Sequence, residues 1–186
     1  MADIHVASEH ADRVVWIGLI VACGTCLSPL FACVTPFAAL AALAALKLDG
    51  RDAAAVVGVV WLANQAIGYG FLGYPWTWDS AAWGLAIGGC CGLAVVAAKA
   101  LSAQRAAPLA ISLPFVAAFT VFEFGLYLAG YVLPGSGGAF SARVVWQVFL
   151  VNAVALFALI ALAELARAVR GVAWKVGSGH PPGAVS

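Results

Sequence analysis

Four long apolar stretches constrain the fold of this chain more than any other feature. Each has about the 20 residues that a helix needs to cross the hydrocarbon core of a bilayer. They cover residues 53–72, 80–98, 109–133 and 143–166, and charged or turn-forming residues separate them. The sequence therefore predicts a transmembrane helix at each of these four positions.

A fifth apolar stretch, residues 14–46, is too long for one straight span. A helix of that length would measure roughly 50 Å, well beyond the hydrocarbon core. Pro29 and Pro36 interrupt it, and the residue before a proline disfavours helix. We predict two short helices, about 14–28 and 36–47, folded back or broken within the membrane. The alternative is a single span that follows an interfacial segment.

These segments together predict an all-α, polytopic transmembrane helix bundle with six helices, or five in the alternative. Only 9% of the residues are charged and 65% are hydrophobic, whereas a soluble domain carries about 25% charged residues. The bundle forms one domain, residues 14–175, between a polar arm at 1–13 and a disordered tail at 176–186. A net charge of +1 without a basic stripe argues against nucleic-acid binding.

Basic residues near the membrane predict the orientation of the bundle. They cluster in the turn after the fourth predicted helix and beyond the last one, at Lys99, Arg105, Arg167, Arg170 and Lys175. The positive-inside rule places that side, and the C-terminus, in the cytoplasm. The N-terminal residues are acidic rather than basic, so no cleavable signal peptide is expected. The expected location is the inner membrane of a bacterial cell.

The predicted helix at 53–72 carries a stripe of polar and aromatic residues. Its members recur at helical spacing and share one face: Trp61, Asn64, Gln65, Gly68 and Tyr69. Amide groups are costly in hydrocarbon, so this face must look into the bundle. One interpretation is a ligand site, in which the amides orient a solute and the rings stack on it. The other is that the amides bond to neighbouring helices as packing contacts.

Glu123 is the only acidic residue deep inside a predicted span. Phe119 and Tyr127 lie one turn away on the same side of the helix. An ionisable group within the membrane suggests function, such as binding a cation or accepting a hydrogen bond from a ligand. A glutamic acid that locks two helices together is the structural alternative. The stripe and this group together make up the candidate ligand-binding set of Trp61, Asn64, Gln65, Tyr69, Phe119, Glu123 and Tyr127.

Small residues at helix-packing spacing mark two further faces. Gly84, Gly88 and Gly92 recur every four residues in one predicted helix, and Ala38 and Ala42 do so in the short one. Such residues let another helix approach closely, within the chain or in a partner membrane subunit.

Cys23 and Cys26 have CxxC spacing, which suits thiol exchange or a soft metal. No basic residue stands close by to activate a thiol, and a buried cysteine is also an ordinary small hydrophobic residue. Every histidine lies outside the predicted spans. We therefore expect no metal site and no catalytic residues, and no cofactor can be named.

The predicted helices, the polar stripe with Glu123 and the alanine pairs resemble, in architecture, the S-components of energy-coupling-factor vitamin transporters. Those substrate-binding subunits are six-helix membrane proteins of similar length that present AxxxA surfaces to a transmembrane coupling subunit. The resemblance implies a vitamin or related micronutrient as ligand, with the ATPase and coupling subunits supplied separately.

The expected function is thus that of a substrate-binding transport component rather than an enzyme. Two alternatives remain from the residues alone. One is a non-catalytic accessory or assembly subunit of a larger membrane complex. The other is a membrane thiol-disulfide oxidoreductase that uses Cys23 and Cys26.

Overall fold

The fold is a bundle of α-helices. The computed structural model describes residues 13–18, 20–22, 35–102 and 109–177. Residues 13–18 and 20–22 are helical. Five labelled helices follow in the described part of the chain: α2 (Phe37–Lys47), α3 (Gly50–Gly70), α4 (Trp78–Leu101), α5 (Leu109–Val132) and α6 (Ala142–Gly177). Within these ranges no residue forms a β-strand. The predicted all-α class is confirmed.

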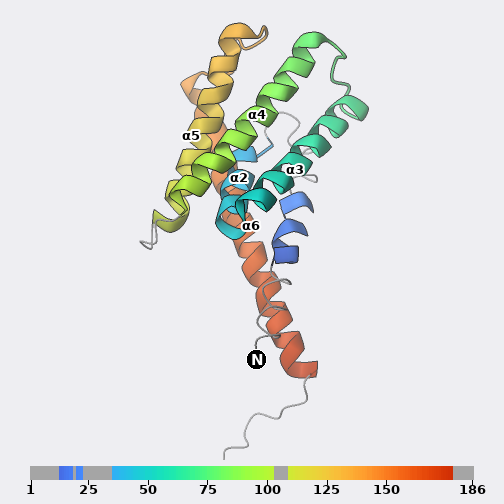
Figure 1. Ribbon diagram of the computed structural model, residues 1–186, viewed down its shortest axis with the longest axis vertical. Coiled ribbons are helices and arrows are strands. Elements are labelled where there is room, and N and C mark those ends of the chain that lie inside the picture. The colour runs from blue at the N-terminus through green and yellow to red at the C-terminus, as the bar shows by residue number, and fades with distance from the viewer. Residues whose placement is uncertain (1–12, 19, 23–34, 103–108, 178–186) are drawn as a thin grey trace, which may run out of the picture.

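Four of the helices are long and apolar enough to cross a membrane. These are Gly50–Gly70, Trp78–Leu101, Ala110–Val132 and Ala142–Val169, each with little charge in its apolar core. The chain is therefore a multi-pass integral membrane protein. α6 has 36 residues and extends past the other helices at one end of the bundle (Figure 1), beyond the predicted end at residue 166.

The long apolar stretch near the N-terminus is divided, as predicted. α2 begins at Phe37, directly after Pro36, and forms a separate short helix of 11 residues. The first predicted helix, 14–28, is helical at residues 13–18 and 20–22, and its remainder lies outside the described residues. Most of the predicted arm, 1–13, and most of the predicted tail, 176–186, also lie outside the described residues.

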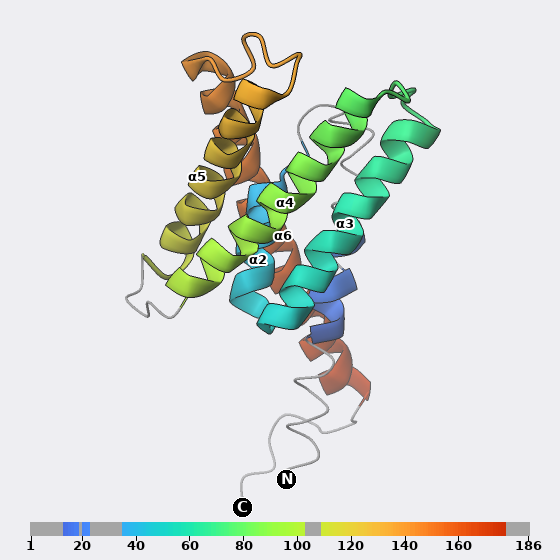
Figure 2. The same cartoon turned by 45° about the horizontal axis from the view of Figure 1, so that its top comes forward.

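α2 lies at the centre of the bundle. α3, α4 and α5 lie side by side, and α2 and α6 lie behind them (Figure 1, Figure 2). α2 packs against all four of the long helices, and its residues from Phe37 to Ala45 are at most 4% exposed. A helix that is apolar on every face suits a position inside a protein core or in lipid, and its alanines let the neighbouring helices approach closely.

Both ends of α2 are held by polar side chains from other helices. At its start, the backbone N–H of Ala39 donates to the side-chain oxygen of Asn152 in α6, at 3.1 Å. At its end, the Lys99 ammonium of α4 donates to the carbonyls of Ala45 and Leu48, at 3.0 and 2.8 Å. Helix ends leave backbone groups without partners, and these contacts satisfy some of them inside the bundle.

Charged residues gather at the end of the bundle where α2 terminates. Arg13 forms an ion pair with Asp52 at the start of α3. Lys47 and Arg167 lie over the Trp16 ring, with the Lys47 nitrogen 5.0 Å and the Arg167 guanidinium carbon 5.6 Å from its centroid. Residue 13 and the late part of α6 therefore lie at the same end. The α3–α4 and α5–α6 turns lie together at the other end (Figure 2).

Candidate functional site

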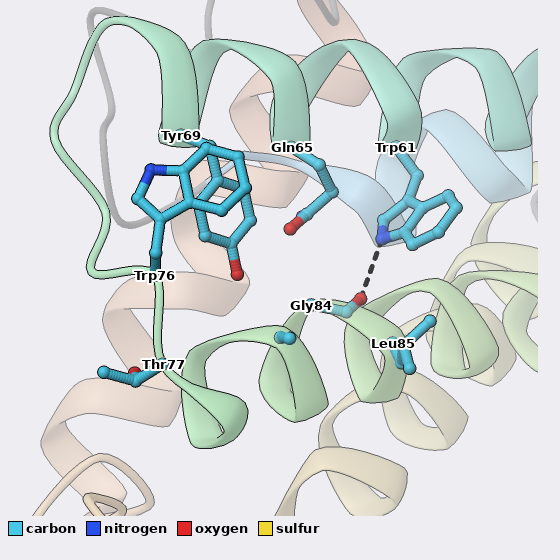
Figure 3. Close-up of a pocket in the computed structure, with 8 residues that line it drawn as sticks. Trp61, Gln65, Tyr69, Trp76, Thr77, Gly84 and Leu85 are labelled. Atoms are coloured by element: carbon cyan, nitrogen blue, oxygen red, sulfur yellow. Dashed lines mark hydrogen bonds between the residues drawn. The ribbon is translucent and has the colours of Figure 1, made fainter.

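The polar stripe of α3 is divided between two neighbours. Asn64 is buried, and its amide nitrogen donates to the Thr35 hydroxyl ahead of α2, at 2.9 Å. Trp61, Gln65 and Tyr69 instead lie along the side of α3 that faces α4 (Figure 3). The residues thus share a broad stripe but do not surround a single cavity.

The α3–α4 side of the stripe forms an open groove of about 460 Å³ near the α3–α4 turn. Trp61 donates its indole N–H to the Gly84 carbonyl at 2.8 Å (Figure 3), and the Tyr69 hydroxyl is 3.1 Å from that of Ser80. The Trp76 ring covers Tyr69, with 4.8 Å between centroids. The hydrogen bonds of Trp61 and Tyr69 therefore hold α3 to α4. This part of the stripe fits the interpretation in which its polar groups are packing contacts.

The glycine series explains this close packing. A Cβ atom on Gly88 would lie 2.6 Å from the Trp61 ring, and one on Gly84 would lie 2.6 Å from the Gln65 side chain. Gly92 has no such neighbour within 4 Å. Gly84 and Gly88 are helix-packing residues within this chain rather than contacts for a partner.

Ala38 and Ala42 also pack inside the chain. Both have 0% exposure because α3, α4, α5 and α6 enclose α2. The expectation that these alanines present a surface to a partner membrane subunit is therefore wrong, although their predicted role in close helix packing stands.

The second side of the stripe contributes to a larger, partly open cavity of about 570 Å³ between the helices, toward the end of the bundle that holds the α3–α4 and α5–α6 turns. Segments from every labelled helix and from both turns at that end contribute to its lining. The lining residues that matter for its chemistry are Thr35, Phe37, Asn64, Tyr74, Trp83, Phe122, Glu123, Ser136 and Phe140. This volume falls within the range of about 300–1,000 Å³ typical of small-molecule sites.

Among the described residues that line this cavity, Glu123 is the only charged one. It is half-buried in α5, and no residue in the described part of the chain forms a hydrogen bond or ion pair with its carboxylate. A carboxylate is costly in a membrane interior unless it is paired. Its position toward a cavity leaves room for a ligand to supply that partner.

Specific contacts hold together the helices and turns that line the cavity. Phe37 of α2 and Phe122 of α5 pack with 6.0 Å between ring centroids. Trp83 of α4 donates its indole N–H to the carbonyl of Pro134 at 2.8 Å, which joins α4 to the α5–α6 turn. Tyr74 packs on Gly68, where a Cβ atom would lie 2.4 Å from its ring. The absence of a side chain at Gly68 therefore leaves space for the Tyr74 ring.

The other two predicted ligand residues lie outside this cavity. Phe119 is buried between α5 and α6, with its ring 5.1 Å from that of Phe149. Tyr127 faces a separate surface pocket near Ser136 and Phe140, and its hydroxyl bonds to that of Tyr131. Of the predicted set, the structure brings Asn64 and Glu123 to this cavity, while Trp61, Gln65 and Tyr69 share the α3–α4 groove.

Sequence reasoning missed most of the aromatic lining. The sequence does not distinguish the rings of Trp83, Phe122 and Phe140, which line the cavity, from rings that face lipid. Asn152 was also missed as the partner of α2. The signal for it was present, because a helix that begins after Pro36 within the membrane needs an acceptor for its first N–H groups.

The thiol and metal predictions are only partly covered by the structure. Cys23 and Cys26 lie outside the described residues, while Cys90 and Cys91 are buried free thiols. Among the described residues, no group of three or more histidine, cysteine, aspartate or glutamate side chains could hold a metal ion. Comparison of the chain with protein-family models, curated proteins and solved structures gives no significant match.

Proposed function

We propose that this membrane protein is the solute-binding subunit of a transporter and that it binds a small molecule in the cavity between Asn64 and Glu123. The observation that carries the proposal is the Glu123 carboxylate, which lines a cavity inside the membrane bundle without a partner among the described residues. Solid packing would offer no reason to maintain such a group there. A bound solute offers one.

The distribution of charge supports a cavity that faces the outer side of the membrane. Arg13, Lys47, Lys99 and Arg167 all belong to the end of the bundle opposite the cavity. The positive-inside rule assigns such an end to the cytoplasm. The cavity then faces the outer side of a bacterial inner membrane, and the C-terminus is cytoplasmic.

The architectural resemblance to vitamin-transporter S-components suggests that other subunits supply the energy. Because Ala38 and Ala42 are enclosed, a coupling subunit would have to contact a lipid-facing surface of this chain instead. A vitamin or related micronutrient is the corresponding ligand class.

The test is to purify the protein in mild detergent and search for a retained solute by native mass spectrometry. We expect a bound small molecule in the wild type and its loss in Glu123→Gln. Glu164→Gln is the matched control, because Glu164 lies on α6, away from the cavity, and pairs with Arg167 on the exposed surface. Retention that is equal in both variants would contradict the proposed site. Fixed stoichiometry with a larger complex and no solute would favour an accessory subunit.

A further inference from the structure

Among the described residues that line the cavity, Glu123 is the only charged one, and its charge is negative. The other polar groups of this lining, which include those of Thr35, Asn64 and Ser136, are neutral. Arg143 stands next to the lining residue Val144, but it is exposed and does not line the cavity. The other basic side chains described above, Arg13, Lys47, Lys99 and Arg167, are held at the opposite end of the bundle. An anionic solute would therefore meet no positive charge among the described lining residues.

Aromatic rings form much of the remaining lining. Phe37, Tyr74, Trp83, Phe122 and Phe140 reach the cavity from α2, α4, α5 and both turns. The electron-rich face of an aromatic ring attracts a cation, and the attraction strengthens where water is excluded. Flat ligands also stack well on such rings.

We propose that the ligand is a monovalent organic cation with a flat ring, whose charge pairs with Glu123 while its ring packs among Phe37, Trp83 and Phe122. This inference rests on the proposed function and adds the chemical class of the solute to it. A carboxylate and aromatic rings around one cavity provide both the counter-charge and the ring contacts that such a cation needs.

Three probes that share one pyridine ring test the charge directly. 1-Methylnicotinamide is a cation, nicotinamide is its neutral counterpart, and nicotinate is an anion. Their binding to the purified full-length protein is measured by isothermal titration calorimetry. We expect the cation to bind at least about tenfold more tightly than the other two, and Glu123→Gln to remove that preference.

A second pair of variants tests the rings without altering charge. Phe122→Leu removes a lining ring, and we expect it to weaken binding of the cation roughly three- to tenfold. Phe124→Leu is the control, since Phe124 lies on the same helix, is 58% exposed and does not line the cavity. It should leave the affinity unchanged.

The outcomes separate this inference from the function on which it rests. Nicotinamide or nicotinate binding as tightly as the cation, or a retained neutral or anionic solute in the native mass spectrum, would overturn the cation inference alone. No retained solute and no binding of any probe would overturn the inference and the proposed function together.

Discussion

The side-chain oxygen of Asn152 accepts a hydrogen bond from the backbone N–H of Ala39, and this contact links α6 to the first turn of α2. The amide nitrogen of Asn152 donates in turn to the Val148 carbonyl at 3.0 Å. Asn152 is 1% exposed, so water cannot replace either contact. One amide thus connects the start of the central helix to a spanning helix.

Replacing Asn152 with alanine should therefore destabilise the protein. The Ala39 N–H would lose its acceptor in a dry environment, at a cost of roughly 1–2 kcal/mol. The midpoint of thermal unfolding in detergent measures the effect. Gln147→Ala is the control, because Gln147 is exposed on the same helix. An equal loss in both variants would contradict the assigned role.

Lys99→Met should destabilise the other end of α2. The change keeps most of the side-chain length but removes the charge that bonds to the carbonyls of Ala45 and Leu48. We expect a loss of about 1–3 kcal/mol, read from the same unfolding midpoint. Arg51→Met removes an exposed positive charge near that end and should have little effect. A stable Lys99→Met protein would show that these carbonyls need no cap.

Gly88→Ala and Gly92→Ala should differ although they lie one turn apart. The new methyl group at 88 would overlap the Trp61 ring, whereas the site at 92 is open. We expect a loss of roughly 1–3 kcal/mol for the first and almost none for the second. Similar unfolding midpoints would mean that the α3–α4 contact adjusts freely.

Asn64→Ala and Gln65→Ala should separate the two sides of the α3 stripe. Asn64 lines the inner cavity, and Gln65 lines the groove toward α4. Solute retention should therefore fall in Asn64→Ala and persist in Gln65→Ala, as measured by native mass spectrometry. The reverse result would move the binding site to the α3–α4 groove.

Cysteine labelling tests the proposed orientation. Gly137→Cys lies in the exposed α5–α6 turn, and Arg51→Cys lies at the opposite, charged end. In intact bacterial cells an impermeant maleimide should label only the first above the wild-type background. Labelling of Arg51→Cys should require permeabilised membranes. The opposite pattern would invert the topology.

The sequence was sufficient to predict the bundle because the length of an apolar stretch and the position of a proline act locally. The division at Pro36 and the long spans follow from these two properties. The site depended on more than local pattern. The α3 stripe is wide enough to face two neighbours at once, and nothing in its spacing indicates that Asn64 turns toward Thr35 while Trp61 turns toward α4.

The alanine-rich helix shows the same limitation. A run of small apolar residues suits contact with another helix, but the sequence does not say whether that helix belongs to the same chain. In the structure, Ala38 and Ala42 of α2 are enclosed by the other helices of this chain. Likewise, the rings of Trp83 and Phe122 line a cavity only because α4 and α5 pack side by side around α2.

The position of α2 in the chain has a consequence for biogenesis. At 11 residues it is about 16 Å long, too short to be inserted as a spanning segment by itself. It also leaves the ribosome before every helix that encloses it. The lysine that caps its last turn follows 54 residues after Ala45, and the asparagine that holds its first turn follows 113 residues after Ala39. α2 can therefore reach its final environment only after the chain has been synthesised as far as Asn152, in the first part of α6.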